Sequence, residues 1–196
     1  MLRLTSYLMG AVILFSTSYL HGKPTTTEKA TFAGGCFWCL QKPFDKVKGV
    51  VRTSVGYTHG KTKNPTYEQV SGGQSGHIEA LQIEYNPSKV SYEQLLKLFW
   101  INVDPFDNGG QFCDRGYQYT TAIFTHNANQ KAVAQKSLTD IQKRFSSKIV
   151  TPIHNATRFY NAEDYHQKYY EKNPVRYKYY RWNCGRDKRL AQIWGK

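Results

Sequence analysis

The chain is predicted to fold as a single α+β domain in which helices cover a sheet, a two-layer sandwich. Segments with the alternating pattern of strands interleave with segments that carry helix caps, without the long strand and helix series of a doubly wound sheet. Hydrophobic residues make up 40% and aromatic residues 15% of the 196 positions, which excludes a disordered chain. The length fits one domain with a substantial core.

Residues 1–22 have the outline of a secretory signal peptide. Arg3 precedes an apolar stretch at residues 8–15, and small residues that suit cleavage follow it. The apolar stretch is short for a membrane span, so we expect a secreted or periplasmic protein, or a membrane-anchored one if the leader is not cleaved. Residues 23–29 are predicted to be a flexible lead-in, and residues 30–196 the single folded domain.

The hexapeptide G-G-C-F-W-C at residues 34–39 joins a predicted strand (residues 29–33) to a predicted helix (residues 37–47). Its two glycines allow a tight turn, which leaves Cys36 beside the first free N–H groups of the helix. A thiol at a helix N-terminus is expected to have a lowered pKa, because the positive end of the helix dipole stabilises the thiolate. Cys36 is therefore a candidate nucleophile.

The Cys36 and Cys39 pattern has other interpretations. A free cysteine is often a small buried hydrophobic residue, and Cys-x-x-Cys also occurs in zinc sites and in thioredoxin-like redox pairs. Cys113 and Cys184 each stand alone, so a four-thiolate zinc site is disfavoured and no metal is expected. The redox interpretation is retained.

Two further strands are predicted at residues 51–57 and 77–85, with a long loop at residues 58–76 between them. Tyr57 lies on the apolar face of the first strand. In the second strand Glu79 shares its face with three apolar or aromatic residues. A carboxylate on a core-facing side is costly unless it is paired or protonated, so Glu79 is a candidate site residue. The alternative is a glutamate at the strand end that reaches solvent.

The second half of the chain has clear helix signals. Ser91 and Gln94 form a capping box, and Asn127 caps a helix that extends to about Phe145. The other predicted segments are a turn-rich loop at 104–116, strands at 117–124 and 149–154, a short helix at 162–171 and an aromatic, basic tail at 177–194. Because its tyrosines and tryptophans need an apolar surface, the tail is expected to wrap around the domain.

Five blocks, in one order, closely resemble the A-type peptide methionine sulfoxide reductases. The blocks are G-G-C-F-W-C at 34–39, V-G-Y-T at 55–58, S-G-H-I-E at 75–79, D-R-G-Y-Q-Y at 114–119 and A-E-D-Y-H-Q at 162–167. The resemblance extends from about Ala30 to the C-terminus. It implies a ferredoxin-like core and the thiol-dependent reduction of methionine S-sulfoxide, free or in proteins, which repairs oxidised proteins.

The reaction needs a soft nucleophile and a proton for the departing oxygen. Cys36 can attack the sulfoxide sulfur, and Glu79 can donate the proton if an apolar setting raises its pKa. Tyr57 and Tyr119 offer phenolic O–H groups that could hold the oxygen as negative charge develops. The alternative for these two tyrosines is a core position with a satisfied hydroxyl, and the resemblance favours the functional role.

Other residues are expected to shape the site. Phe37 and Trp38 are suited to packing against the methyl group of the substrate. The resemblance alone adds Asp114 to the catalytic group, and His77 is expected to support the site without taking part in the reaction. Two departures from the family pattern, Thr120 and the pair His59-Gly60, are expected at the pocket rim.

The expected cycle converts Cys36 to a sulfenic acid. This sulfenic acid then condenses with a second thiol to form a disulfide. The family commonly uses a resolving cysteine in its C-terminal tail, so Cys184 is the first candidate and Cys39 the second. Four cysteines allow three full pairings, and a redox role of Cys113 stays open. No bound cofactor is expected, only an external thioredoxin-like dithiol reductant.

The formal net charge of +13 raises the question of a nucleic-acid or membrane partner. The basic residues are spread along the chain without a nucleic-acid motif, so we expect a solvated basic face, no nucleic-acid partner, no stable membrane association and a monomer. Two rival functions are a thioredoxin-like disulfide oxidoreductase, in which Glu79 and the tyrosines would have no role, and a disulfide-stapled basic binding module.

Overall fold

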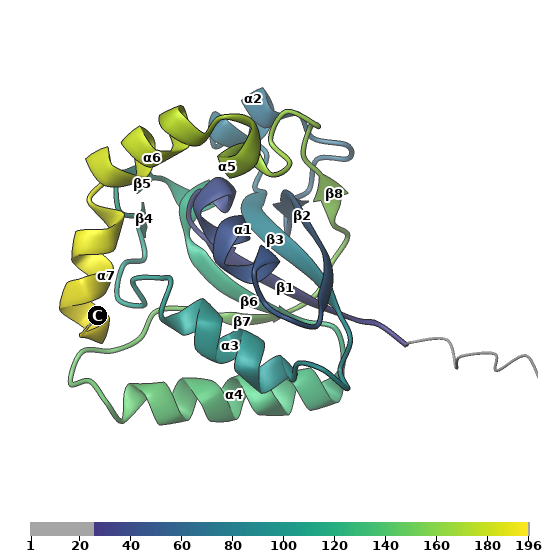
Figure 1. Ribbon diagram of the computed structural model, residues 1–196, viewed down its shortest axis with the longest axis vertical. Coiled ribbons are helices and arrows are strands. Elements are labelled where there is room, and N and C mark those ends of the chain that lie inside the picture. Colours follow the sequence, from purple (N-terminus) through teal and green to yellow (C-terminus); the bar gives the residue numbers. More distant parts are fainter. Residues whose placement is uncertain (1–25, 196) are drawn as a thin grey trace, which may run out of the picture.

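A six-stranded sheet forms the centre of the computed structural model, which describes residues 26–195 (Figure 1). The strand order is β7-β6-β1-β3-β2-β8, and every neighbouring pair is antiparallel except β6 and β7. The strands are β1 (Glu28–Gly34), β2 (Val50–Thr58), β3 (Ile78–Tyr85), β6 (Thr121–Thr125), β7 (Ile153–Asn155) and β8 (Tyr160–Asn161), and β4 (Gly110–Gln111) pairs separately with β5 (Asp114–Arg115). The predicted leader, residues 1–22, lies outside the described residues.

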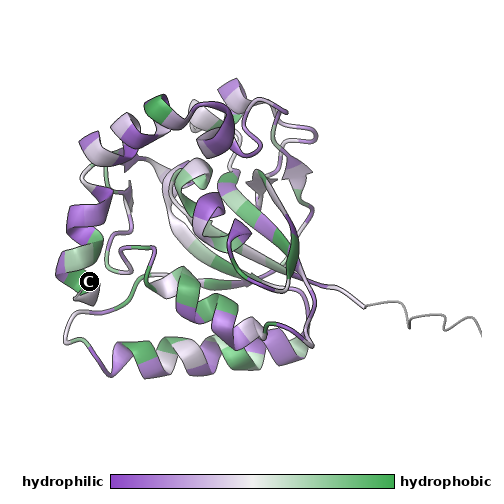
Figure 2. Ribbon diagram, viewed as in Figure 1, coloured by the Kyte–Doolittle hydropathy of each residue, from purple (hydrophilic) through white to green (hydrophobic). Residues whose placement is uncertain are grey.

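Three helices pack on one face of this sheet. The helices of the chain are α1 (Phe37–Asp45), α2 (Tyr67–Ser71), α3 (Tyr92–Trp100), α4 (Ala128–Gln142), α5 (Tyr169–Lys172), α6 (Pro174–Asn183) and α7 (Arg186–Trp194), with a 3-10 helix, η1 (Tyr117–Tyr119). Side chains of α1, α3 and α4 share one buried cluster with the strands, and Figure 2 shows hydrophobic residues concentrated on the central strands and α3. None of the helices within residues 26–195 combines the length and apolar character that a bilayer span requires.

The two-layer α+β prediction is confirmed, and the connectivity identifies the core. The chain runs β1-α1-β2-β3, then through α3 to β6, and these four strands lie in the order β6-β1-β3-β2. This β-α-β-β-α-β arrangement is the ferredoxin-like fold. A second, smaller cluster that includes Ile78, Ala80 and Phe124 covers the other face of the sheet. The alternation predicted for β3 is therefore present, and Glu79 faces the helical layer.

The predicted caps are also present. The Ser91 hydroxyl accepts a hydrogen bond from the Gln94 N–H while the Gln94 side chain accepts one from the Ser91 N–H. The Asn127 side chain accepts one from the Gln130 N–H at 2.8 Å and opens α4. The lead-in ends earlier than predicted, because β1 already begins at Glu28.

Three segments differ from prediction. The expected loop at 58–76 contains α2, which a capping box of Thr66 and Gln69 begins. The expected strand at 117–124 begins only at Thr121, because Gly116 has φ +119° and starts the 3-10 turn η1. In place of the helix expected at 162–171, the chain forms the shorter helix α5 (Tyr169–Lys172). The tail does run along the side of the domain, but as two helices, α6 and α7 (Figure 1).

Candidate active site

The turn between β1 and α1 holds Cys36 at the N-cap of the helix. Gly35 has φ +76°, and a Cβ at this position would lie 2.5 Å from the Cβ of Gln111. Only glycine fits such a turn without strain. Cys36 is 6% exposed, and its side chain lines a small cavity.

This cavity has a volume of about 80 Å³. The side chains that line it are Cys36, Phe37, Trp38, Tyr67, Glu79, Asp114, Tyr119 and Tyr180. Pockets that enclose whole small-molecule ligands usually measure about 300–1,000 Å³. The cavity is thus suited to the end of one side chain. All the predicted catalytic and substrate-binding residues line it except Tyr57.

Glu79 is buried at the start of β3, opposite Tyr57 of β2 in the sheet register. It is 2% exposed, and its Oε2 accepts a hydrogen bond from the Phe37 N–H at 3.1 Å. Burial raises the pKa of Glu79 to about 8, with further contributions from the negative charges of Asp114 and Cys39, while the Phe37 N–H opposes the shift. As predicted, the carboxyl group is mainly protonated near neutral pH and has a proton to donate.

The two free thiols, Cys36 and Cys39, share a hydrogen bond, and their pKa values are shifted in opposite directions. Burial raises the pKa of Cys36, and the hydrogen bond to Cys39 and the negative charges of Cys39, Glu79 and Asp114 raise it further. The same hydrogen bond lowers the pKa of Cys39 to about 7, aided by Arg186 and Arg181 and opposed by burial.

The expected low pKa of Cys36 was therefore wrong. The dipole of a helix contributes a modest stabilisation, whereas burial removes the solvation of the thiolate. Within the pair, the hydrogen bond favours ionisation of Cys39 and disfavours ionisation of Cys36.

Tyr67, which the sequence did not single out, takes the place in the cavity lining that was expected for Tyr57. The Tyr57 side chain is fully buried, and its hydroxyl donates to Oε2 of Glu163 at 2.8 Å, away from the cavity. Tyr67, at the start of α2, lines the cavity instead, and its N–H donates to Oε1 of the same carboxylate at 2.9 Å. Burial raises the pKa of Tyr67 to about 12 and raises that of Tyr119 as well, so both phenols keep their protons.

Aromatic contacts hold the apolar wall of the cavity. The Trp38 ring stacks on Tyr169 with centroids 3.8 Å apart, and its Nε1–H donates to Nδ1 of His166 at 3.0 Å. The His166 ring lies between Phe37, at 5.1 Å, and Tyr67, at 4.5 Å. The sequence showed His166 only as part of the block at 162–167 and did not indicate its contact with Trp38. Its fixed position keeps the indole and phenyl faces in place for an apolar group.

Asp114 and Tyr180 form another part of the cavity lining. The Tyr180 hydroxyl donates to Oδ2 of Asp114 at 2.5 Å, and burial raises the pKa of this carboxyl group. Asp114 follows Cys113 directly, whereas Tyr180 lies on α6. The chain holds 15 tyrosines, so nothing in the sequence singled out Tyr180.

The first candidate for the resolving thiol, Cys184, is bonded to Cys113, with their Cα atoms 4.9 Å apart. Cys39, the second candidate, is free and hydrogen-bonded to Cys36. Within residues 26–195, one group of three side chains has the spacing of metal ligands: Cys113, Asp114 and Cys184. Both of its sulfur atoms belong to the disulfide.

His77 and the two departures from the family pattern lie outside the cavity lining. His77 is 1% exposed, and its ring nitrogens contact the Gly60 N–H at 3.2 Å and the Thr62 carbonyl oxygen at 2.7 Å. It fixes the loop that follows β2, as its expected supporting role requires. The Thr120 hydroxyl donates to the Tyr117 carbonyl oxygen.

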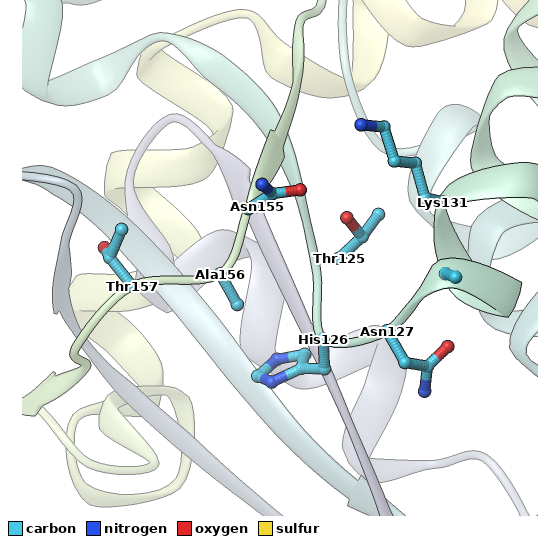
Figure 3. Close-up of a pocket in the computed structure, with 8 residues that line it drawn as sticks. Thr125, His126, Asn127, Lys131, Asn155, Ala156 and Thr157 are labelled. Atoms are coloured by element: carbon cyan, nitrogen blue, oxygen red, sulfur yellow. The ribbon is translucent and has the colours of Figure 1, made fainter.

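A larger cavity of about 500 Å³ opens at the N-terminus of α4 (Figure 3). Its lining residues are Thr125, His126, Asn127, Ala128, Lys131, Asn155, Ala156 and Thr157. Gly34 pairs with Thr121 at the start of β6, so Thr125 lies at the other end of that strand from the thiols. This lining contains neither a thiol nor a carboxylate, which leaves the redox chemistry to the smaller cavity.

Comparison with known proteins gives a consistent result. The family model described as peptide methionine sulfoxide reductase matches residues 28–196. The chain is 50% identical over 171 residues to the peptide methionine sulfoxide reductase MsrA of Bacillus licheniformis, which covers 86% of this chain and 94% of the relative. The corresponding MsrA of Bacillus subtilis is 50% identical over 170 residues and covers 86% and 96%. Reduced Mxr1 from Saccharomyces cerevisiae superposes with a TM-score of 0.73 at 32% identity, covering 78% of this chain and 89% of that one.

Proposed function

Because this chain belongs to the peptide methionine sulfoxide reductase family, we propose that Cys36 reduces methionine S-sulfoxide to methionine inside the small cavity. One observation carries this assignment. The Cys36 thiol shares a small cavity with Glu79, a buried carboxyl group whose pKa is raised to about 8, and with the phenols of Tyr67 and Tyr119. A nucleophile for sulfur and three O–H donors for oxygen are the groups that the reaction needs.

Oxygen transfer starts with the methylsulfinyl group in the cavity, its methyl carbon against Phe37 and Trp38. The Cys36 sulfur attacks the sulfoxide sulfur while Glu79 gives its proton to the sulfoxide oxygen, and the Glu79 carboxylate takes up the proton of the Cys36 thiol. The adduct collapses with oxygen on the Cys36 sulfur as a sulfenic acid, and methionine leaves with the electrons of its broken S–O bond.

Tyr67 and Tyr119 hold the oxygen during this step, and Asp114 acts through its hydrogen bond with Tyr180. Phenols whose pKa values are raised remain donors throughout the physiological pH range. Tyr57 has no part in this arrangement, because its hydroxyl proton is already donated to Glu163.

Cys39 completes the cycle. The Cys39 thiol loses its proton to the solvent, and its thiolate attacks the sulfenic sulfur of Cys36. The S–O bond breaks, and the oxygen takes up a proton and leaves as water. The two thiols have then supplied the two electrons that the sulfoxide gained. A thioredoxin-like dithiol reduces the Cys36 and Cys39 disulfide and restores both thiols.

The resolving role is tested by Cys39→Ser, with the double variant Cys113→Ser/Cys184→Ser as the matched control. With thioredoxin as the reductant, Cys39→Ser is expected to release about one methionine per enzyme and then stop with a sulfenic acid that dimedone traps. The control is expected to keep turning over. The assignment fails if the control stops after one methionine and Cys39→Ser continues.

Substrate and location are proposed from the remaining observations. The cavity accepts one side-chain end, which supports both free methionine sulfoxide and exposed sulfoxides in oxidised proteins as substrates. The basic start and apolar stretch of residues 1–22 support a secreted or periplasmic enzyme. Sequencing the N-terminus of the protein recovered from cell fractions tests this location, and an intact leader in the membrane fraction would contradict it in favour of an anchored enzyme.

A further inference from the structure

Arg186, the first residue of α7, is a buried cation without a carboxylate partner in the described part of the chain. It is 2% exposed. Its Nη2 donates to the carbonyl oxygens of Gly34 at 3.1 Å and Asn102 at 2.6 Å, its guanidinium lies 4.4 Å from the Phe112 ring centroid, and its Nε has no hydrogen-bond partner. By contrast, the nearby Arg181 and Arg189 form ion pairs with Asp187 and Asp104.

Burial of such a charge requires an anion. A guanidinium stays protonated in proteins, and an unpaired buried charge is strongly destabilising. Two carbonyl oxygens and an aromatic face offset part of this cost, but they supply only dipoles. The surroundings of Arg186 show which groups could carry a balancing negative charge.

Arg186 lies against the turn that presents the thiols. Gly34, whose carbonyl it contacts, precedes the turn, and a Cβ on Gly35 would lie 3.7 Å from Nη1 of Arg186. The negative charges of Cys39 and Cys36 raise the pKa of the guanidinium, opposing the effect of burial. The thiol pair is therefore a nearby source of negative charge that interacts with the guanidinium.

We propose that Arg186 is the buried counter-charge of the Cys36 and Cys39 pair, a positioning residue that keeps negative charge on Cys39 and speeds its attack on the sulfenic acid. This inference rests on the proposed role of Cys39 as the resolving thiol. In that step the Cys39 sulfur bonds to the Cys36 sulfur and the oxygen departs as water. Arg186 neither gives nor takes a proton, and it acts only through its charge.

The other charged groups around the pair do not replace it. Arg181 of α6 donates to the Cys39 carbonyl oxygen at 3.4 Å, but Asp187 neutralises it. Asp114 of β5 opposes ionisation of Cys39, Glu79 of β3 is mainly neutral below pH 8, and Tyr177 of α6 keeps its proton because burial raises its pKa to about 12. The charge of Arg186 also lowers the pKa of Asp114, but within residues 26–195 no ion pair joins Arg186 to a carboxylate.

The test compares Arg186→Gln, which removes the charge, with Arg186→Lys, which keeps it, and with Arg189→Gln as the control on the same helix. The thiolate absorbance is titrated in each full-length protein. Arg186→Gln is expected to move the titration of Cys39 upward by about one pH unit or more, whereas Arg186→Lys retains most of the wild-type value and Arg189→Gln retains all of it.

Single-turnover kinetics at neutral pH separate the steps. With methionine sulfoxide in excess and no reductant, Arg186→Gln is expected to release the first methionine within about threefold of the wild-type rate but to form the disulfide about tenfold more slowly. If Arg186→Gln does not fold, Arg186→Met removes the charge with an apolar chain of similar length. An unchanged titration, equal slowing of both steps, or a wild-type Cys39 that titrates like an ordinary thiol overturns the inference. Continued turnover of Cys39→Ser instead refutes the proposed function.

Discussion

Glu79 lies on the face of β3 that is otherwise occupied by apolar and aromatic side chains. Its burial makes ionisation costly, and the same burial leaves it with the proton that the reaction consumes. The residue therefore contributes to catalysis at the expense of stability. This relation can be measured, because both effects follow from one pKa.

Replacement by glutamine separates the two effects. Glu79→Gln is expected to lower the rate of methionine release by about 10²- to 10⁴-fold, since an amide cannot donate a proton as an acid does. It is also expected to make the fold more stable than wild type near pH 8. Between the reference pKa of 4.5 and the folded value of about 8, the folded state keeps a proton that the unfolded chain has lost, so wild-type stability falls as pH rises.

The stability effect amounts to as much as about 1.4 kcal/mol per pH unit within that interval. Urea unfolding at several pH values measures it. The wild-type and Glu79→Gln curves are expected to converge towards pH 4.5, and a constant difference at every pH would contradict the buried neutral acid. Wild-type activity is expected to decline above pH 8 as Glu79 loses its proton.

At the scale of elements, local signals predicted local structure. The alternation in β3 gave Glu79 its correct face, and Ser91 and Asn127 gave the starts of α3 and α4, because caps and alternation involve neighbours in the chain. Thr66 and Gln69 have the sequence spacing of a capping box, which would have predicted the start of α2. Because α2 was not predicted, Tyr57 of β2 was expected at the place in the cavity that Tyr67 takes.

This difference between α2 and β2 predicts a contrast between two conservative variants. Tyr67→Phe is expected to lower kcat/KM by about tenfold or more, because it removes a donor from the oxygen. Tyr57→Phe leaves the cavity lining intact and is expected to cost about 1–3 kcal/mol of stability, since Glu163 loses a buried partner. Steady-state kinetics and thermal unfolding of both variants provide the measurement. A larger catalytic loss for Tyr57→Phe would reverse the assignment.

The features that could not be predicted from the sequence are contacts between residues far apart in the chain. The partners of Tyr180 and His166 lie 66 and 128 residues away, and the lowered pKa expected for Cys36 came from its own helix while burial by distant segments decided the outcome. The resemblance supplied Asp114, yet the pairing of Cys113 and Cys184 depends on a fold that spacing does not determine.

At the scale of the molecule, the Cys113 and Cys184 disulfide closes a segment of 71 residues and fastens the helical tail to the region around β5. Its two cysteines lie close in sequence to the residues of one cavity wall, since Asp114 follows Cys113 and Tyr180 lies four residues before Cys184. In the proposed function the cross-link thus stabilises the wall, while Cys36 and Cys39 supply the thiol chemistry.

The double variant Cys113→Ser/Cys184→Ser is accordingly expected to lose about 2–4 kcal/mol of unfolding free energy, as is usual for a link that closes a long loop. Its KM is expected to rise more than its kcat falls, because the wall is loosened while Cys36 and Cys39 remain. Urea unfolding without reductant and steady-state kinetics measure the two effects. An unchanged KM would show that the tail stays in place without the link.

The volume of the space around Cys36 also limits what the protein can recognise. An interior that receives only the tip of one side chain cannot inspect the amino acids before and after it in a polypeptide. Lesions are then selected by accessibility: those on loose or unfolded stretches enter, and those enclosed in a folded core wait until the chain opens. The proposed function therefore predicts a generalist enzyme, for which the conformation of the damaged protein sets the order of repair.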